Sequence, residues 1–256
     1  MKRLLKVVNY CNNIKGYLSI CRKLFTIQGT VTSSESKKDI FFSQQGIFKI
    51  KQDFFKEING NNYIYNLSNK YAEHFLNDKN IGNLGTARQG LITGDNNRFL
   101  RFWFEPSTSK FNNKWFPYEK GGNYRKWYGN KTYLVNWENN GYEIKHTFND
   151  KGKLRSRPQN IEWYFKEGLS WTALTAGDFS IRYSSSEFIF DAMGPKLFIK
   201  DNQYTYYVLS LLNSKIGNIF ITFLCPNFKF DQKPIERIPL VIEKKIFISI
   251  KSVSPK

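Results

Sequence analysis

The chain has 256 residues, of which 41% are hydrophobic, so it is long enough to bury a sizeable core. Its 39 lysines and arginines outnumber its 21 acidic residues and give a net charge of +18, which indicates a polyanionic partner such as nucleic acid. The longest apolar stretch, residues 216–225, is about half as long as a membrane-spanning helix, so we expect no membrane span and no membrane partner.

The first residues, MKRLLKVVNYCNN, begin like a secretion signal, but Lys6 interrupts the apolar run and asparagines occupy the place of a cleavage region. We therefore expect a cytoplasmic protein with free thiols. The two histidines, His74 and His146, lie far apart and no cysteine cluster accompanies them, so the sequence predicts no metal site.

Residues 1–40 show no clear period and are predicted to be a poorly specified leader. Residues 41–50 have strand composition, and residues 66–78 predict a helix with Ser68 as its N-cap. Beyond Gly82 short strand-like segments alternate with clusters of Gly, Asn and Asp. This pattern predicts an α+β fold with a twisted, mainly antiparallel sheet and flanking helices. The predicted strands are residues 85–94, 99–105, 132–137, 179–183, 187–191 and 196–199.

A single long helix is predicted over residues 204–223, stopped by Pro226. Three prolines in residues 226–242 favour an extended, turn-rich strap over a further helix. We expect three parts in the chain: the leader 1–40, a DNA target-recognition domain 41–243 and a tail 244–256.

The first candidate site is the segment QGLITGDNNRFLRFW, residues 89–103. Its glycine turn can present backbone N–H groups to phosphate, and Asn and Arg side chains can pair with adenine or guanine edges. The same composition is also typical of ordinary turns. The candidate DNA-binding residues of this turn are Thr93, Gly94, Asp95, Asn96, Asn97 and Arg98.

Two further basic segments are candidates for DNA contact. Residues 114–145 interleave aromatic and basic side chains, which suits phosphate neutralisation and base stacking, although about half of the aromatics are expected in the core, with Trp127 and Trp137 as the leading alternatives for burial. Residues 151–160 read as an exposed basic loop or as a solvated charge run. The candidates from both segments are Lys120, Arg125, Lys126, Trp127, Tyr128, Arg155 and Arg157.

Catalytic motifs are missing from the sequence. It contains no Pro-Pro dipeptide for holding a flipped adenine and no glycine-rich strand-to-helix turn for a methyl donor. Paired carboxylates beside a lysine, as a metal-dependent nuclease needs, are not evident either. We therefore predict no catalytic residues.

Six segments in order resemble the region that follows the catalytic domain in PglX-like adenine-specific DNA methyltransferases of BREX phage-defence systems. They cover roughly residues 44–243, and the turn and the closing IERIPL also resemble target-recognition regions of restriction-modification adenine methylases. The segments are GLITGDNNRFLRFW, KWFPYEKGGNYRKWYGN, VNWENNGYEI, WYFKEGLSWTALTAGDFSIRY, FIFDAMGPKLF and LLNSKIGN.

The resemblance implies sequence-specific binding of double-stranded DNA, delivery of an adenine for methylation and marking of host DNA. It also implies that S-adenosyl-L-methionine is bound by a catalytic domain that this chain lacks. We expect no methylation by the chain alone, which is a fragment or a split subunit served by a separate methyltransferase polypeptide. The alternatives are a half-sized specificity subunit of a multi-subunit restriction enzyme with a long pairing helix, a small DNA nuclease, or a non-functional gene remnant.

Overall fold

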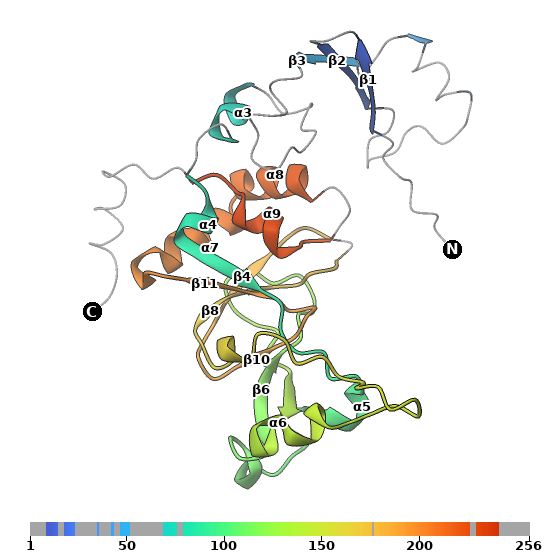
Figure 1. Cartoon of the computed structure of the whole chain (residues 1–256). Helices are drawn as coiled ribbons and strands as arrows, with labels where there is room; N and C mark the ends of the chain where they lie inside the picture. The colour runs from blue at the N-terminus through green and yellow to red at the C-terminus, as the bar shows by residue number, and fades with distance from the viewer. Residues whose placement is uncertain are drawn as a thin grey trace. The chain divides into compact units, whose positions relative to one another are not determined.

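The computed structural model describes residues 9–14, 18–23, 35, 42–43, 47–51, 69–75, 79–175, 177–225 and 229–240. The chain divides into two compact units, Met1–Leu76 and Asn77–Lys256 (Figure 1). The border between the units falls inside the predicted domain 41–243, whose limits stay a prediction.

The first unit contains a three-stranded antiparallel sheet in the order β1-β2-β3, formed by β1 (Asn9–Ile14), β2 (Leu18–Lys23) and β3 (Ile47–Lys51). Helix α3 (Asn69–Phe75) lies within the predicted helix 66–78, while its predicted N-cap Ser68 is outside the described residues. Two strands, β1 and β2, thus lie within residues 1–40, where the sequence pattern indicated no regular element.

The second unit is built on two four-stranded sheets. The first sheet has the order β10-β6-β7-β5, in which β10 and β6 are parallel and the remaining pairs of strands are antiparallel. The second sheet has the order β4-β11-β8-β9 and is antiparallel throughout. The predicted α+β fold is confirmed, with two mainly antiparallel sheets in this unit. The strands are β4 (Gly85–Arg88), β5 (Leu100–Phe102), β6 (Trp115–Glu119), β7 (Tyr133–Asn136), β8 (Gly168–Trp171), β9 (Ile181–Ser184), β10 (Ile189–Phe190) and β11 (Lys196–Ile199).

The predicted long helix is wrong, because the chain breaks at Ser214 into α7 (Thr205–Asn213) and α8 (Lys215–Leu224). The Ser214 hydroxyl accepts a hydrogen bond from the Gly217 N–H at 3.0 Å and so caps α8. The helical residues before and after the break are bent by 75°. No single helix in the described part of the chain is long and apolar enough to cross a membrane, and this bent pair reaches that length and composition only when its two halves are counted together.

The predicted extended strap contains the short helix α9 (Gln232–Glu236), which corrects the prediction for these residues. The Ile81 N–H donates to the Ile238 carbonyl and the Leu240 N–H to the Lys79 carbonyl, both at 3.0 Å. The Glu236 carboxylate accepts from the Ala87 N–H in β4 at 2.8 Å. The strap therefore closes the second unit against the beginning of β4.

One cluster of the buried core joins both sheets. Phe198 from β11 packs with residues from β5, β6, β7 and β10, and burial of each large apolar side chain stabilises the fold by about 1.5–3 kcal/mol. Trp137 is buried, as the core alternative predicted. The cluster consists of Leu91, Phe99, Leu100, Tyr118, Val135, Trp137, Ile144, Tyr164, Ile189, Phe190 and Phe198.

Shorter helical elements complete the second unit. They are α4 (Ile81–Leu84), α5 (Asn96–Phe99), η1 (Thr108–Lys110), α6 (Glu138–Lys145), η2 (Ile161–Trp163) and η3 (Asn202–Tyr204).

Candidate nucleic-acid interface

The glycine turn at residues 93–98 is held between the end of β10 and the basic segment 151–160. The Leu91 N–H donates to the Phe190 carbonyl at 2.8 Å, and Ile92 and Arg157 exchange backbone hydrogen bonds of 3.1 and 2.8 Å. Gly94 has a φ of +76°, and a Cβ there would lie 2.5 Å from the Arg155 carbonyl oxygen. The positive φ and the close approach both require glycine, so the backbone brings the turn and the basic segment together.

The turn continues directly into the four-residue helix α5. The Asp95 carboxylate accepts from the Arg98 N–H at 3.1 Å, and the Thr93 hydroxyl donates to the Asn96 Oδ1 at 2.7 Å. Thr93 is only 3% exposed, so its hydroxyl holds Asn96 from the buried side of the turn, and the Asn96 Nδ2 group has no partner among the described residues. Asn96, Asn97 and Arg98 are exposed, as readers of base edges must be.

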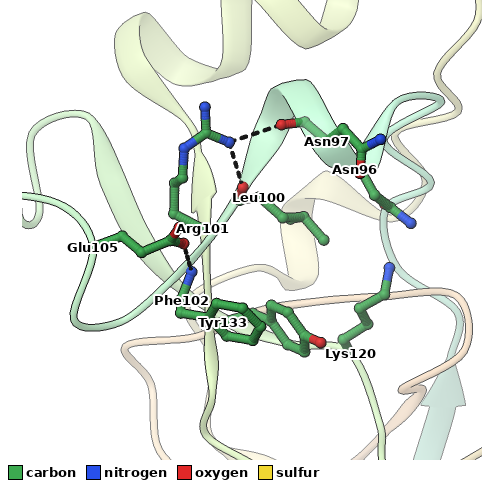
Figure 2. A pocket seen from close by; sticks show the side chains of 8 residues that line it. All are labelled: Asn96, Asn97, Leu100, Arg101, Phe102, Glu105, Lys120 and Tyr133. Carbon is green, nitrogen blue, oxygen red and sulfur yellow. Dashed lines mark hydrogen bonds between the residues drawn. The ribbon is translucent and has the colours of Figure 1, made fainter.

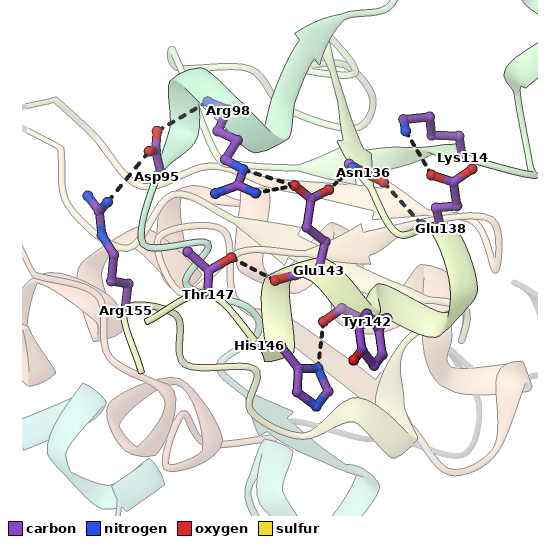
Figure 3. A network of polar contacts seen from close by, with 10 residues as sticks. All are labelled: Asp95, Arg98, Lys114, Asn136, Glu138, Tyr142, Glu143, His146, Thr147 and Arg155. Carbon is purple, nitrogen blue, oxygen red and sulfur yellow. Dashed lines mark hydrogen bonds and ion pairs between the residues drawn. The ribbon is translucent and has the colours of Figure 1, made fainter. Parts of the chain in front are cut away.

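Two arginines of the site have carboxylate partners (Figure 3). The Arg98 Nε and Nη2 donate to the Glu143 Oε1 at 2.9 and 2.5 Å. The Arg155 Nη1 lies 3.9 Å from the Asp95 Oδ2. Arg155 and Arg157 are both exposed, as predicted for this loop.

A pocket of about 440 Å³ opens beside the turn, between Asn96 and Asn97 on one side and Lys120 and Tyr133 on the other (Figure 2). The Phe102 and Tyr133 rings stack along it with centroids 5.2 Å apart. The lining of the pocket thus combines amide, cationic and aromatic groups with the carboxylate of Glu105. Its lining residues are Asn96, Asn97, Leu100, Arg101, Phe102, Glu105, Lys120 and Tyr133.

Exposed aromatics next to this pocket were not among the predicted site residues. Phe102, Trp103 and Phe104 are all exposed, and the Phe102 and Phe104 rings are parallel at 5.5 Å. A signal existed in the sequence, since three successive aromatics cannot all face the core of a strand whose side chains alternate.

Asp191 and its hydrogen-bond partner Tyr118 hold the backbone at Leu91, just before the turn. The Tyr118 hydroxyl donates to the Asp191 Oδ2 at 2.7 Å and lies 3.1 Å from the Leu91 carbonyl, and the Lys120 Nζ is 3.7 Å from the same carboxylate oxygen. Burial raises the pKa of Asp191, against the lowering effects of its hydrogen bonds and of Lys120. Burial, and secondly Asp191, raises the pKa of Tyr118, so its hydroxyl remains a donor.

The segment Arg125–Tyr128 lies against other elements, namely β9 and the end of α7. The Trp127 N–H donates to the Ile181 carbonyl at 3.1 Å, and the Lys126 Nζ to the Asn213 carbonyl at 2.7 Å. Trp127 is 50% exposed, so the alternative that it belongs to the core is wrong, and Tyr128 is also exposed. The thirteen candidates therefore form two groups, with Lys120, Arg155 and Arg157 near the turn and residues 125–128 elsewhere on the unit.

The turns after the two parallel strands can be compared with the glycine-rich turn expected of a methyl-donor site. The parallel strands β6 and β10 are followed by the turns starting at Lys120 and Asp191, and neither leads through a glycine-rich turn into a helix. Over the same residues, no three His, Cys, Asp or Glu side chains gather as metal ligands.

Fold and site together define an α+β unit with an exposed glycine turn that presents amide and guanidinium groups. No protein-family model matches the chain. It is 34% identical over 207 residues to the adenine-specific methyltransferase PglX of Lacticaseibacillus casei (strain Zhang), and 35% identical over 220 residues to the adenine-specific methyltransferase BrxX of Escherichia coli O9:H4 (strain HS). These alignments cover 76% and 82% of this chain but only 17% of each relative. The chain is therefore homologous to a part of these adenine-specific methyltransferases.

Proposed function

We propose that this chain is the DNA target-recognition part of an adenine-specific DNA methyltransferase of a BREX-type phage-defence system. The proposal rests on homology, because the chain aligns with 17% of the length of each of two adenine-specific methyltransferases. The glycine turn of the chain also presents Asn96, Asn97 and Arg98 to solvent. The net charge of +18 supports a polyanionic partner, which we take to be double-stranded DNA.

The turn and its neighbours have different roles in this proposal. Asn96, Asn97 and Arg98 read base edges in a groove, because amides and guanidinium groups match adenine and guanine bidentately. The exposed cations Arg155 and Arg157, together with Lys120, bind phosphates beside the turn. The segment 125–128 supplies a second backbone contact with its exposed Trp127 and Tyr128.

Methyl transfer itself belongs to a separate polypeptide or to a missing part of the same protein. That catalytic part binds S-adenosyl-L-methionine and the target adenine, while this chain selects the DNA sequence and holds it in register. The result is methylated host DNA that the defence system leaves intact. A specificity subunit with a long pairing helix is disfavoured, because residues 204–225 are barely long enough for such a helix and the break at Ser214 divides them.

The experiment is selection from a random duplex pool by the purified chain at about 0.15 M salt, followed by sequencing, because non-specific binding falls steeply with salt. We expect enrichment of a short motif that contains adenine. Binding that vanishes with salt and enriches nothing would refute the proposal.

Two variants separate the roles of the arginines. Arg98→Lys keeps the charge but loses the planar fork, so it should reduce preference at one base pair by about 1–3 kcal/mol. Arg157→Ala should weaken binding to cognate and random duplexes alike and flatten the salt dependence. Equal losses on both duplexes for Arg98→Lys would remove Arg98 from the base-reading set.

A further inference from the structure

The segment VNWENNGYEI, residues 135–144, brings Glu143 to Arg98 and places Asn136 beside Glu143 (Figure 3). The Glu143 Oε1 accepts hydrogen bonds from the Arg98 Nε and Nη2 at 2.9 and 2.5 Å. Its other oxygen, Oε2, accepts a hydrogen bond from the Asn136 Nδ2 at 3.0 Å. Asn136 is buried in β7, so the exposed pair of Arg98 and Glu143 is tied to the sheet.

Local backbone geometry places Glu143 at this point. Helix α6 is interrupted by three residues with positive φ, Asn139, Asn140 and Gly141. A Cβ at Gly141 would lie 2.4 Å from the Trp137 ring, so this position requires glycine. Such conformations persist only where the surroundings impose them. The Thr147 hydroxyl also donates to the Glu143 carbonyl at 2.7 Å, which fixes the end of the helix.

The contacts leave a defined part of the guanidinium available. Arginine has five N–H donors, and Glu143 uses the edge formed by Nε and one N–H of Nη2. The remaining end-on fork of Nη1 and Nη2 has no partner among the described residues and can pair bidentately with O6 and N7 of guanine. The Arg98 Cζ also lies 5.2 Å from the centroid of the Phe99 ring, which further limits its motion.

A carboxylate beside a DNA-binding arginine opposes non-specific affinity, because it repels phosphate and offsets the cationic charge. Its presence next to Arg98 is therefore explained by orientation of the guanidinium and not by attraction to the DNA backbone. A residue that only served phosphate binding would gain from the absence of Glu143.

We propose that Glu143, anchored by Asn136, is a positioning residue that sets base specificity by aiming the free fork of Arg98 at a guanine edge and by keeping Arg98 off the phosphates. This inference rests on the proposed function. It assigns a guanine to the recognised sequence, in addition to the adenine that is methylated.

The test compares Glu143→Ala with Glu138→Ala in the full chain, by selection from random duplexes and by salt titration of affinity. Glu138 is the matched control, because it lies on the same helix and forms a partly buried ion pair with Lys114 at 2.7 Å, and no contact with Arg98 is seen among the described residues. Both variants remove one acidic charge, so both should bind random duplex more tightly at low salt.

Only Glu143→Ala should lose sequence information. We expect the preference for one G·C pair to fall by about five- to 150-fold, which corresponds to one bidentate base contact. Glu143→Gln keeps an oxygen for Arg98 and should give a preference between those of the wild-type and the alanine variant. If circular dichroism shows that Glu143→Ala is unfolded, the test is the comparison of Glu143→Gln with the wild-type chain.

The outcomes distinguish the inference from the function on which it rests. If the wild-type chain enriches a motif and both Glu143 variants enrich the same motif with equal preference, the positioning role is wrong and the recognition function stands. If Glu138→Ala loses the same preference as Glu143→Ala, a general change of charge explains the effect and the positioning role is also wrong. If the wild-type chain enriches no motif, the recognition function fails and the inference fails with it.

Discussion

Lys196 is fully buried in β11, and its titration should make the stability of the protein depend on pH in a defined direction. Its Nζ donates to the Lys166 carbonyl at 2.9 Å, and the Phe190 and Phe198 rings lie within 6 Å. Burial lowers the pKa of Lys196 from 10.5 to about 8, against an opposing effect of Glu119, while Lys131 lowers it further. Between these two pKa values the unfolded chain holds a proton that the folded chain has released.

The free energy of unfolding therefore rises with pH in the window from about 8 to 10.5, because protons then favour the unfolded state. At about 1.4 kcal/mol per pH unit the full effect is roughly 3 kcal/mol, of which about 1 kcal/mol should develop between pH 7 and 9. Burial also raises the pKa of the Cys225 thiol from 9.0 to about 12, which makes stability fall with pH above about 9. Measurements are best confined to pH 7–9 for this reason.

The assay is urea unfolding of the wild-type chain and of Lys196→Met, which keeps an unbranched side chain in the same space. Subtracting the two curves removes the contributions of Cys225 and of every other group that titrates alike in both proteins. We expect the stability of the wild-type chain relative to Lys196→Met to increase by about 1 kcal/mol from pH 7 to pH 9. A difference that stays constant over this range would refute a lowered pKa at Lys196.

Two further substitutions test the backbone of the second unit. Gly94→Ala should destabilise the turn by about 1–3 kcal/mol, because its φ is +76° and the new Cβ would meet the Arg155 carbonyl; urea unfolding and duplex affinity measure the loss, and an unchanged unfolding midpoint would contradict it. Ser214→Ala removes the hydroxyl that caps α8 at Gly217 and should cost about 1 kcal/mol, whereas Ser210→Ala, on the exposed side of α7, serves as the control with little change.

Alternation and turn composition were sufficient to predict six strands of the second unit, each of which overlaps its predicted segment. They did not reveal β6, since Pro117 within it and the basic residues around it are untypical of a strand, although β6 lies inside its sheet between β10 and β7. Nor did they reveal β8, which is only four residues long and begins with Gly168. In both strands tertiary pairing outweighs the local preference.

The break between α7 and α8 illustrates a different limit. An apolar period continues across Ser214, and a serine in such a run can lie inside a helix or cap a new one. The structure resolves the choice through packing: a Cβ at Gly217 would lie 2.1 Å from the Leu211 carbonyl oxygen, so the two helices approach too closely for any other residue. Ser214 and Gly217 were the local signs of the bend.

Within the candidate site, the sequence located the turn but not the partners of its charges. Arg98 and Glu143 are 45 positions apart, and only the arrangement of β7 and α6 beside α5 brings them into contact. Likewise, the aromatic-basic stretch 114–145 reads as one surface in the sequence, yet Lys120 lies at the pocket while residues 125–128 pair with β9. Long-range contacts of this kind leave no periodic signal.

The distribution of charge at the turn bears on how the proposed recognition works. Three cations in or beside the turn lie within 4 Å of a carboxylate, which reduces the local positive potential despite the net charge of +18. The pairs are Arg98 with Glu143, Arg155 with Asp95, and Lys120 with Asp191. Unpartnered cations would bind any duplex, and the resulting affinity would mask differences between sequences. In the proposed recognition, paired cations would bind well only where a base or a correctly placed phosphate replaces water. Arg98 would then discriminate between bases, Arg155 and Lys120 would hold phosphates only at fixed positions, and charges elsewhere on the chain would supply general attraction to DNA.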